Sequence, residues 1–352
     1  MTELTWLSKS LPALLLAATI CSAQTQRDTN SLAPDAGSSF SSDFASAEKL
    51  LHQGKYDDAI SELQKQAAKI PPPEHLSREL GVAYYQKGEY LKAVEYLKTA
   101  HAEDSRDNES VQLLGLSYYL AGHPAEAIPY LEKVQSWYPR ANVDATYILG
   151  ISYIQSKDYP KARVAFARMF DVPSDSAASY LFTARMLLRQ DFDPVAEEYA
   201  IKAITLDSKL PGAHQMLGEL YLYKSRIPEA IEQLQKEVSL NPASAVAYYK
   251  LADAYSRLQK FDDAERLLQR SIWLDATSTG PYILMGKVLE KKGEFELAVR
   301  ALRHASAMDP NNPVTHHLLG QSYRDMGMKQ EAEAELKIAE ELQSKQDAGP
   351  AK

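Results

Sequence analysis

The stretch LSRELGVAYYQKGEYLKAVEYLKTAHA, residues 76–102, decides the fold of this chain. In its first half Leu80 and Tyr84 lie one helical turn apart, Gly88 then interrupts the pattern, and residues 90–102 resume the apolar period of a helix. Glycine is common just past the end of a helix. The stretch therefore predicts two amphipathic helices that run antiparallel to each other.

The same pattern returns along the chain with a period of 34 residues, and once of 35. Nine alanines mark it: Ala59, Ala93, Ala127, Ala162, Ala196, Ala230, Ala264, Ala298 and Ala332. A parallel column of small residues, which lets helices cross closely, holds Ala47, Gly81, Gly115, Gly150, Ala184, Gly218, Ala252, Gly286 and Gly320. A fixed period of this length is typical of a solenoid, in which each unit buries its apolar face by stacking on its neighbours. The sequence therefore predicts an all-α solenoid of about nine antiparallel helix pairs, with repeats that start near residues 40, 74, 108, 143, 177, 211, 245, 279 and 313.

Composition narrows the class of protein further. Of the 352 residues 45% are hydrophobic, which suits an ordered, water-soluble chain. The periodic array favours one elongated domain over the two that length alone suggests. The net charge of −8 argues against the basic surface of a nucleic-acid-binding protein.

Residues 1–23 differ from the rest of the chain and are predicted to be an export signal. Lys9 precedes the apolar run 11–20, and small residues up to Ala23 lead into a polar segment. Cleavage there removes Cys21, the only cysteine. A second interpretation is a lipoprotein signal in which Cys21 becomes a lipidated first residue. We therefore expect a periplasmic or secreted protein or, on the second interpretation, a membrane-anchored lipoprotein.

The remaining sequence divides into three segments. Residues 24–43 are rich in Ser, Asp, Asn and Gln and are predicted to be a disordered linker. The repeat array is expected to cover residues 44–342, and residues 343–352 to form a polar tail. This division leaves no segment of the size of a catalytic domain.

Residues at fixed places in each unit resemble those of the tetratricopeptide-repeat family. In the second unit they are Leu80, Gly81, Tyr84, Gly88, Tyr90, Ala93, Leu97 and Ala100, and in the third Leu114, Gly115, Tyr118, Gly122, Ala127 and Leu131. The family's tryptophan early in the first helix is absent, and Tyr180, Tyr248 and Tyr282 take its place in three units. The resemblance covers all but the two ends of the chain. It implies a right-handed α-solenoid, or superhelix, whose concave surface binds other proteins.

The candidate binding residues follow from the same resemblance, because in this family one side of each first helix lines the concave surface. In the second unit Leu80 and Tyr84 face the partner helix, and the opposite side carries Arg78, Val82 and Tyr85. The matching positions of the next three units hold Leu116, Tyr119, Tyr147, Ile151, Ile154, Leu181, Arg185 and Leu188. Later units place charged residues there, including Glu219, Asp253, Lys287 and Glu290. The alternative is that some of the apolar residues pack against the first helix of the adjacent unit.

No motif in the chain predicts catalysis, a cofactor or a bound metal. Ser117 resembles part of a serine-hydrolase elbow, but it lies inside a first helix and lacks the second glycine of that motif. His316 and His317 are adjacent, so on a helix their side chains point about 100° apart. Acidic pairs that start at Asp57 and Asp262 recur at matching positions, and we interpret them as helix-capping residues.

These observations predict an exported, non-catalytic scaffold that binds a segment of a protein or peptide partner in the concave groove. We expect no nucleic-acid partner and no small-molecule substrate, and membrane contact only through N-terminal lipidation. Two alternatives stay open. One is a lipid-anchored factor that assembles an envelope or secretion complex, and the other is a repeat region associated with an enzyme.

Overall fold

The computed structural model describes residues 44–137, 143–191 and 193–347. Within these ranges all regular secondary structure is helical, and no strand occurs. The chain divides into two units, residues 1–172 and 173–352, and each is described by itself. The predicted export signal 1–23 and linker 24–43 lie outside the described residues.

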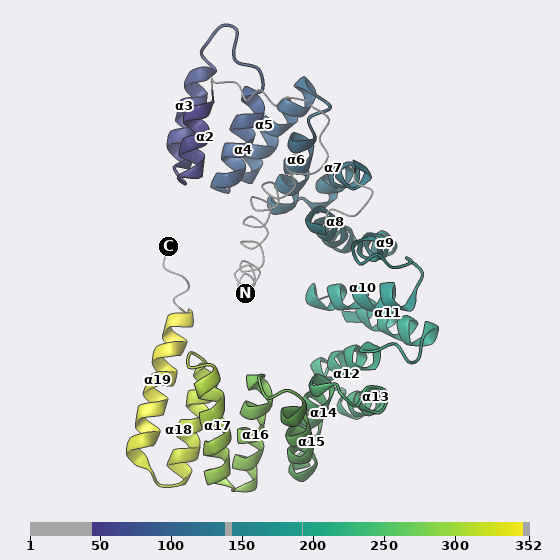
Figure 1. The fold of residues 1–352 in the computed structure, drawn as a ribbon, viewed down its shortest axis with the longest axis vertical. Helices are drawn as coiled ribbons and strands as arrows, with labels where there is room; N and C mark the ends of the chain where they lie inside the picture. Colours follow the sequence, from purple (N-terminus) through teal and green to yellow (C-terminus); the bar gives the residue numbers. More distant parts are fainter. Residues whose placement is uncertain (1–43, 138–142, 192, 348–352) are drawn as a thin grey trace, which may run out of the picture. The chain divides into compact units, whose positions relative to one another are not determined.

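The first unit is a stack of four helix pairs (Figure 1). Its helices are α2 (Ala45–His52), α3 (Tyr56–Gln66), α4 (Leu76–Lys87), α5 (Tyr90–Glu103), α6 (Asn108–Leu120), α7 (Pro124–Trp137), α8 (Val143–Gln155) and α9 (Tyr159–Met169). Each helix packs against the next along the chain. The even-numbered helices are the first helices of repeats one to four, and the odd-numbered helices are the second helices.

The second unit continues the same plan with five helix pairs. Its helices are α10 (Ala177–Arg189), α11 (Asp193–Leu206), α12 (Ala213–Tyr223), α13 (Ile227–Leu240), α14 (Ala245–Arg257), α15 (Phe261–Leu274), α16 (Thr279–Lys292), α17 (Phe295–Met308), α18 (Pro313–Asp325) and α19 (Lys329–Asp347). The described residues therefore hold nine helix pairs, and the predicted all-α solenoid architecture is confirmed.

The column of small residues lies where the two helices of a pair cross. A Cβ atom added at Gly286 would lie 2.4 Å from Cγ of Leu302, and one added at Gly81 would lie 2.6 Å from Cγ of Leu97. These separations are shorter than van der Waals contact, so a larger residue forces the helices apart. The prediction that this column permits close helix crossing is confirmed.

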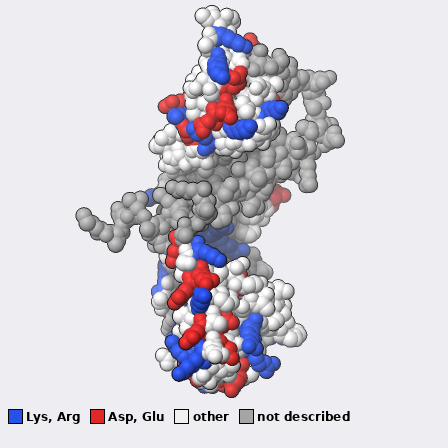
Figure 2. Space-filling model, turned by 90° about the vertical axis from the view of Figure 1, so that its left-hand side faces the viewer, with Lys and Arg blue, Asp and Glu red and all other residues white. Residues whose placement is uncertain are grey.

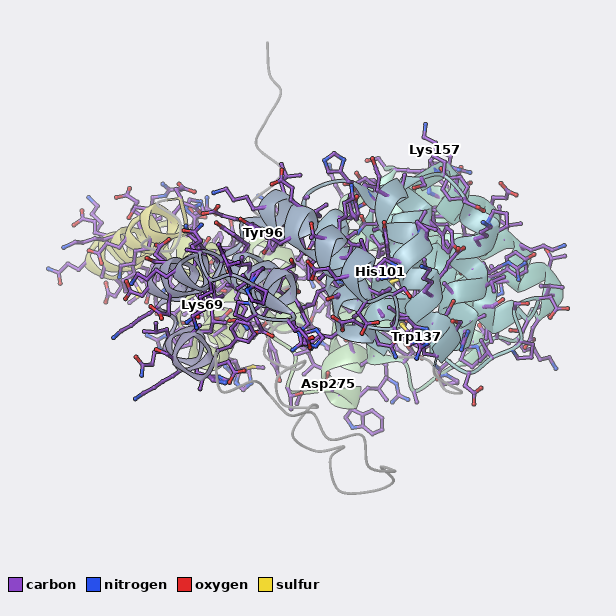
Figure 3. All side chains as sticks on the ribbon, turned by 90° about the horizontal axis from the view of Figure 1, so that it is seen from above. Lys69, Tyr96, His101, Trp137, Lys157 and Asp275 are labelled. Carbon is purple, nitrogen blue, oxygen red and sulfur yellow. The ribbon has the colours of Figure 1, made fainter. Side chains whose placement is uncertain are left out.

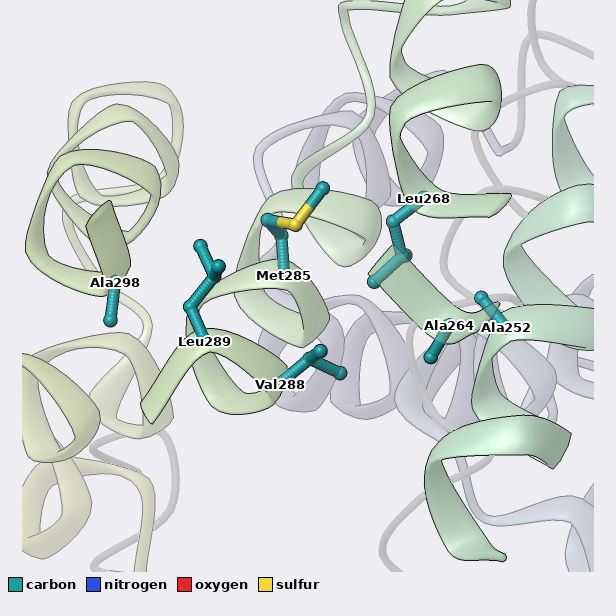
Figure 4. Packing of buried hydrophobic residues seen from close by; sticks show 7 residues of the cluster. All are labelled: Ala252, Ala264, Leu268, Met285, Val288, Leu289 and Ala298. Carbon is teal, nitrogen blue, oxygen red and sulfur yellow. The ribbon is translucent and has the colours of Figure 1, made fainter. Parts of the chain in front are cut away.

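The hydrophobic core is shared between neighbouring repeats. In one cluster, Ala252, Ala264 and Leu268 of repeat seven pack with buried side chains of repeat eight, which are Met285, Val288, Leu289 and Ala298 (Figure 4). Residues of α14 and α15 form this core only together with residues of α16 and α17. A single helix pair therefore has no complete core of its own.

Every helix pair turns through a residue with a left-handed backbone. Five of these residues are glycines, Gly54, Gly88, Gly122, Gly293 and Gly327, with φ between 72° and 85°. The other four are Lys157, Asp191, Ser225 and Gln259, with φ between 57° and 61°. The side chain of Lys157 points away from the ribbon at such a turn (Figure 3). The turn geometry is thus constant, although only some turns carry the glycine that favours it.

Two details differ from the sequence interpretation. Helix α19 continues to Asp347, into the predicted polar tail 343–352, and Gln343 supports it with a 3.0 Å hydrogen bond to Asp347. The acidic pairs lie in the first turns of α3 and α15, where a carboxylate suits the helix N-terminus, but they do not occupy the N-cap positions, which Lys55 and Lys260 hold. In addition, Asp57 pairs with Lys87 at 2.6 Å and Asp262 with Lys292 at 2.9 Å, which joins adjacent repeats.

Candidate functional site

The first helices of successive repeats form a continuous layer in each unit. In unit 1, α4 contacts α6 and α6 contacts α8, and in unit 2 the contacts run from α10 through α12, α14 and α16 to α18. Contacts between successive second helices are sparser. Successive first helices pack more closely than successive second helices, so each stack curves toward its first helices. The side of the first helices that faces away from the second helices therefore lies on the concave face of each stack. This is the surface on which the candidate residues were predicted.

In unit 1 this surface carries five half-buried apolar or aromatic side chains, which we call the first-helix face: Val82, Tyr85, Leu116, Tyr119 and Tyr147. Their neighbours hold the rings in place. The Tyr85 ring meets Tyr90 edge to face, with 5.9 Å between ring centroids, and Tyr147 packs on Phe166 at 6.4 Å. The face is therefore built from rigid rings that keep part of their surface exposed.

Tyr119 links two neighbouring first helices on this face. Burial raises the pKa of its phenol, the nearby Tyr147 raises the pKa further, and a side-chain hydrogen bond with Gln155 opposes the change. The hydroxyl stays protonated at neutral pH and is able to donate a hydrogen bond. Tyr119 thus presents a neutral polar atom at the centre of an apolar surface.

Arg78 lies beside the first-helix face but is already paired. Its Nε and Nη2 donate hydrogen bonds to Oε1 of Glu79 at 3.1 and 2.9 Å. Glu79 is buried, so the pair is largely shielded from water. The candidate cation therefore contributes little free charge to the face.

Three candidates expose almost no surface. Ile151 is 1% exposed, Ile154 0% and Leu181 3%. Their side chains fill the array, as the alternative interpretation of the sequence allowed. They are not available to contact a ligand, so the proposals below do not use them.

The candidate residues of unit 2 have polar surroundings. Leu188 is half-buried and Arg185 is exposed, with Nη2 over the start of α12 at Gly212. Further along, Gln215 donates to Glu219 at 2.9 Å, and Arg257 pairs with Asp253 at 2.8 Å. The first helices of this unit therefore present mainly hydrogen-bonded polar and charged groups.

Sequence reasoning missed the buried carboxylate of Glu237. Glu237 in α13 is 1% exposed, and its two oxygens accept hydrogen bonds from the backbone N–H groups of Gly212 at 3.0 Å and Gln215 at 3.2 Å. It thereby caps the start of α12 from the second helix of the same repeat. The sequence did carry a signal for this role, because Glu237 stands at a repeat position that holds the small residues Ala100 and Ala305 in other units.

In the described residues, the side chains that commonly bind metal ions do not gather into a metal-binding cluster. No group of three or more His, Cys, Asp and Glu side chains in them is arranged to hold an ion. Ser117 and Ser322 are buried inside first helices. Blue and red side chains are interspersed on the two described parts of the surface in Figure 2. In the described part of the chain, no helix combines the length and apolarity needed to cross a bilayer.

Comparison with known families finds matches along both units. Profiles described as tetratricopeptide repeat match residues 44–108, 216–281 and 280–312. A profile described as anaphase-promoting complex, cyclosome, subunit 3 matches residues 86–169. No curated protein matches the chain.

Solved structures resemble parts of the chain at low identity. A crystal structure of MamA is 26% identical over 47% of this chain and 96% of its own, with a TM-score of 0.44. YrrB, described as a TPR protein with an unusual peptide-binding site, is 22% identical over 48% of this chain and 88% of its own, with a TM-score of 0.43. PilF of Pseudomonas aeruginosa is 19% identical over 58% of this chain and 97% of its own, with a TM-score of 0.47.

Proposed function

Because this chain is a tetratricopeptide-repeat protein, we propose that it is a non-catalytic scaffold that binds a segment of a partner protein on the first-helix face of unit 1. The repeat fold supports a protein-interaction scaffold. The observation that carries the finer proposal is the set of five half-buried apolar and aromatic side chains on consecutive first helices, Val82, Tyr85, Leu116, Tyr119 and Tyr147.

The physical basis is the cost of leaving such side chains in water. Each keeps apolar surface that a ligand can cover, and removal of that surface from water stabilises a complex by about 25 cal/mol per Å². The tyrosine rings are already held by Tyr90, Phe166 and Gln155, so binding loses little side-chain entropy. Tyrosine is common at the energetic centre of protein interfaces for this reason.

A crosslinking experiment identifies the partner and the face together. A photo-crosslinking residue is placed at Leu116 or Tyr119 in the full chain, and in control chains at Leu91 or Val164, which are exposed on second helices of the same unit. We expect the same partner to be captured from the first-helix face and not from the control positions. Equal capture from both sets of positions contradicts the proposal.

Affinity for the purified partner then tests the mechanism. The double variant Leu116→Ser and Tyr119→Ala should bind at least about ten-fold more weakly, which corresponds to about 1.4 kcal/mol. The matched control Leu91→Ser and Val164→Ser should bind as the unmodified chain does. Thermal unfolding by circular dichroism shows whether both variants keep the repeat fold. Unchanged affinity of a folded first-helix variant contradicts this assignment of the face.

We also propose that the chain is exported. Support comes from its first residues, where Lys9 precedes the apolar run 11–20 and small residues up to Ala23 follow. The mass of the mature protein separates the two modes of export. A chain that begins at Gln24 supports soluble export to the periplasm or medium, whereas a lipid on Cys21 supports the alternative of a membrane-anchored assembly factor. An uncleaved N-terminus contradicts both.

A further inference from the structure

Trp273 lies on the surface of α15 and is 73% exposed. An exposed indole keeps a large apolar area in water, and tryptophan is among the residues most enriched at the centres of protein interfaces. The helix ends just beyond it, at Leu274, and Asp275 follows as the C-terminal cap (Figure 3). Packing within the repeat therefore does not explain why Trp273 is a tryptophan.

The guanidinium of Arg270 lies against this indole. Its central carbon is 4.3 Å from the centroid of the Trp273 ring and 6.0 Å from that of Tyr248 in α14. Both distances are within the range of cation–π attraction. Stacking engages the faces of the guanidinium and leaves its N–H edge able to donate hydrogen bonds.

The N–H groups of the Arg270 guanidinium have no hydrogen-bond acceptor within the described ranges, although acidic residues are close in sequence. Asp263 pairs with Arg266 at 2.6 Å, and Glu265 with Lys292 at 2.6 Å. Asp275 accepts hydrogen bonds from the backbone N–H and the hydroxyl of Thr277 at 2.9 and 2.6 Å. Each of these carboxylates is engaged elsewhere, and Arg270 has no ion pair with any described residue.

We propose that Trp273, Arg270 and Tyr248 form a second protein-binding site, whose ligand is an acidic segment with an apolar side chain next to a carboxylate. The carboxylate accepts hydrogen bonds from the planar edge of Arg270, in the geometry that favours arginine over lysine. The neighbouring apolar side chain covers the indole of Trp273. Charge complementarity selects the acidic ligand, because the unpaired charge at this cluster is positive.

This site is separate from the first-helix face and goes beyond the function proposed above. It is built on the second helix α15 and on the side of α14 that meets it. The next residue of α14, Tyr249, points about 100° away from Tyr248, and its ring would lie 3.3 Å from a Cβ atom added at Gly280 of the following first helix. A protein with both sites is able to hold two partners, or two segments of one partner, at once.

Tryptophan fluorescence of the full chain tests the proposal directly. Trp6 and Trp137 are replaced by phenylalanine so that emission reports Trp273 alone. The probe is a blocked peptide of alternating Glu and Leu, compared with counterparts in which Gln replaces Glu or Ser replaces Leu. We expect a saturable change in emission with the Glu–Leu peptide and at least ten-fold weaker binding of both counterparts.

Variants on α15 supply the matched control. Arg270→Lys keeps the charge but loses the planar edge, and should weaken binding at least five-fold. Arg266→Lys alters a cation on the same helix that is already paired with Asp263, and should leave binding unchanged. Equal binding of the Gln–Leu peptide, or equal loss in the two arginine variants, overturns the proposal. Displacement of the peptide by inorganic phosphate or by phosphatidylglycerol vesicles assigns the cluster to phosphate groups and also overturns it.

Discussion

Arg303 in α17 donates a hydrogen bond from Nε to the hydroxyl oxygen of Tyr323 in α18, over 2.7 Å. The bond joins the second helix of repeat eight to the first helix of repeat nine. The same positions at other repeat boundaries are occupied by Gln64 with Tyr84 at 3.3 Å and Gln235 with Tyr255 at 2.9 Å. Tyr84, Tyr255 and Tyr323 therefore each pack inside their own repeat and accept a hydrogen bond from the second helix of the preceding repeat.

Replacement of Tyr323 by phenylalanine isolates this contact. The side chain is 3% exposed, and phenylalanine keeps its ring in place, so the loss should be confined to the hydrogen bond. We expect the free energy of unfolding to fall by about 1 kcal/mol. A double-mutant cycle with Arg303→Ala checks the origin of the effect in denaturant titrations. If the two changes add without coupling, the bond does not stabilise the boundary between these repeats.

The sequence predicts much of the fold, because periodic residues report local geometry. Leu80, Tyr84 and Gly88 place two helices and a turn, and the structure has α4 and α5 in those positions. The polar contacts between repeats were not predictable in this way. Their donors differ in kind from one boundary to the next, as Gln64 and Arg303 do, and they meet their tyrosines only after the repeats stack.

The candidate site was predicted less completely than the fold. Helical angle identifies the side of each first helix that faces away from its partner helix, and it does so equally for Tyr119 and Ile151. It does not distinguish a residue open to solvent from one covered by the adjacent first helix, and Ile151 proves to be buried. The cluster at Arg270 and Trp273 was missed because a basic residue recurs at the Arg270 position, as at Arg168 and Lys236, whereas the tryptophan occurs there in this repeat alone.

Left-handed turns that lack glycine should be weak points. Gln259 adopts φ of 58°, a conformation that costs a residue with a Cβ atom of order 1 kcal/mol. Gln259→Gly should therefore raise the free energy of unfolding by up to about 1 kcal/mol. The reverse change, Gly293→Gln, places a side chain where φ is 80° and no atom lies within 4 Å, so it should lower stability without a steric clash. Denaturant midpoints that move in the same direction in both variants contradict this account.

Glu197 should make stability depend on pH. Burial raises the pKa of its carboxyl, but hydrogen bonds from Lys224 at 2.7 Å and Arg226 at 2.8 Å outweigh this and hold the pKa below its ordinary value of about 4.5. A carboxyl whose pKa is lower in the folded state stabilises the fold above the unfolded value. That stabilisation is lost as pH falls from about 4.5 through the folded pKa.

The test compares Glu197→Gln with the unmodified chain across pH. The variant should be less stable at neutral pH, and the difference should shrink as the pH falls below about 4.5. Glu198→Gln is the control, because Glu198 is exposed and forms no ion pair with the described residues. The stability difference between Glu197→Gln and the unmodified chain could instead stay constant down to acid pH. That result shows that protonation of Glu197 does not change the stability of the fold.

The close crossing at Gly286 makes the strongest prediction for the core. Gly286→Ala places a methyl group 2.4 Å from Cγ of Leu302, and should lower the free energy of unfolding by about 1–3 kcal/mol. Repeat five suggests the rescue, because the matching positions there hold Ala184 and Ala200, both fully buried. In the presence of Leu302→Ala, which itself destabilises by leaving a cavity, Gly286→Ala should cost much less. If Gly286→Ala lowers the free energy of unfolding equally in the unmodified chain and in the Leu302→Ala variant, crowding at the helix crossing is not the cause.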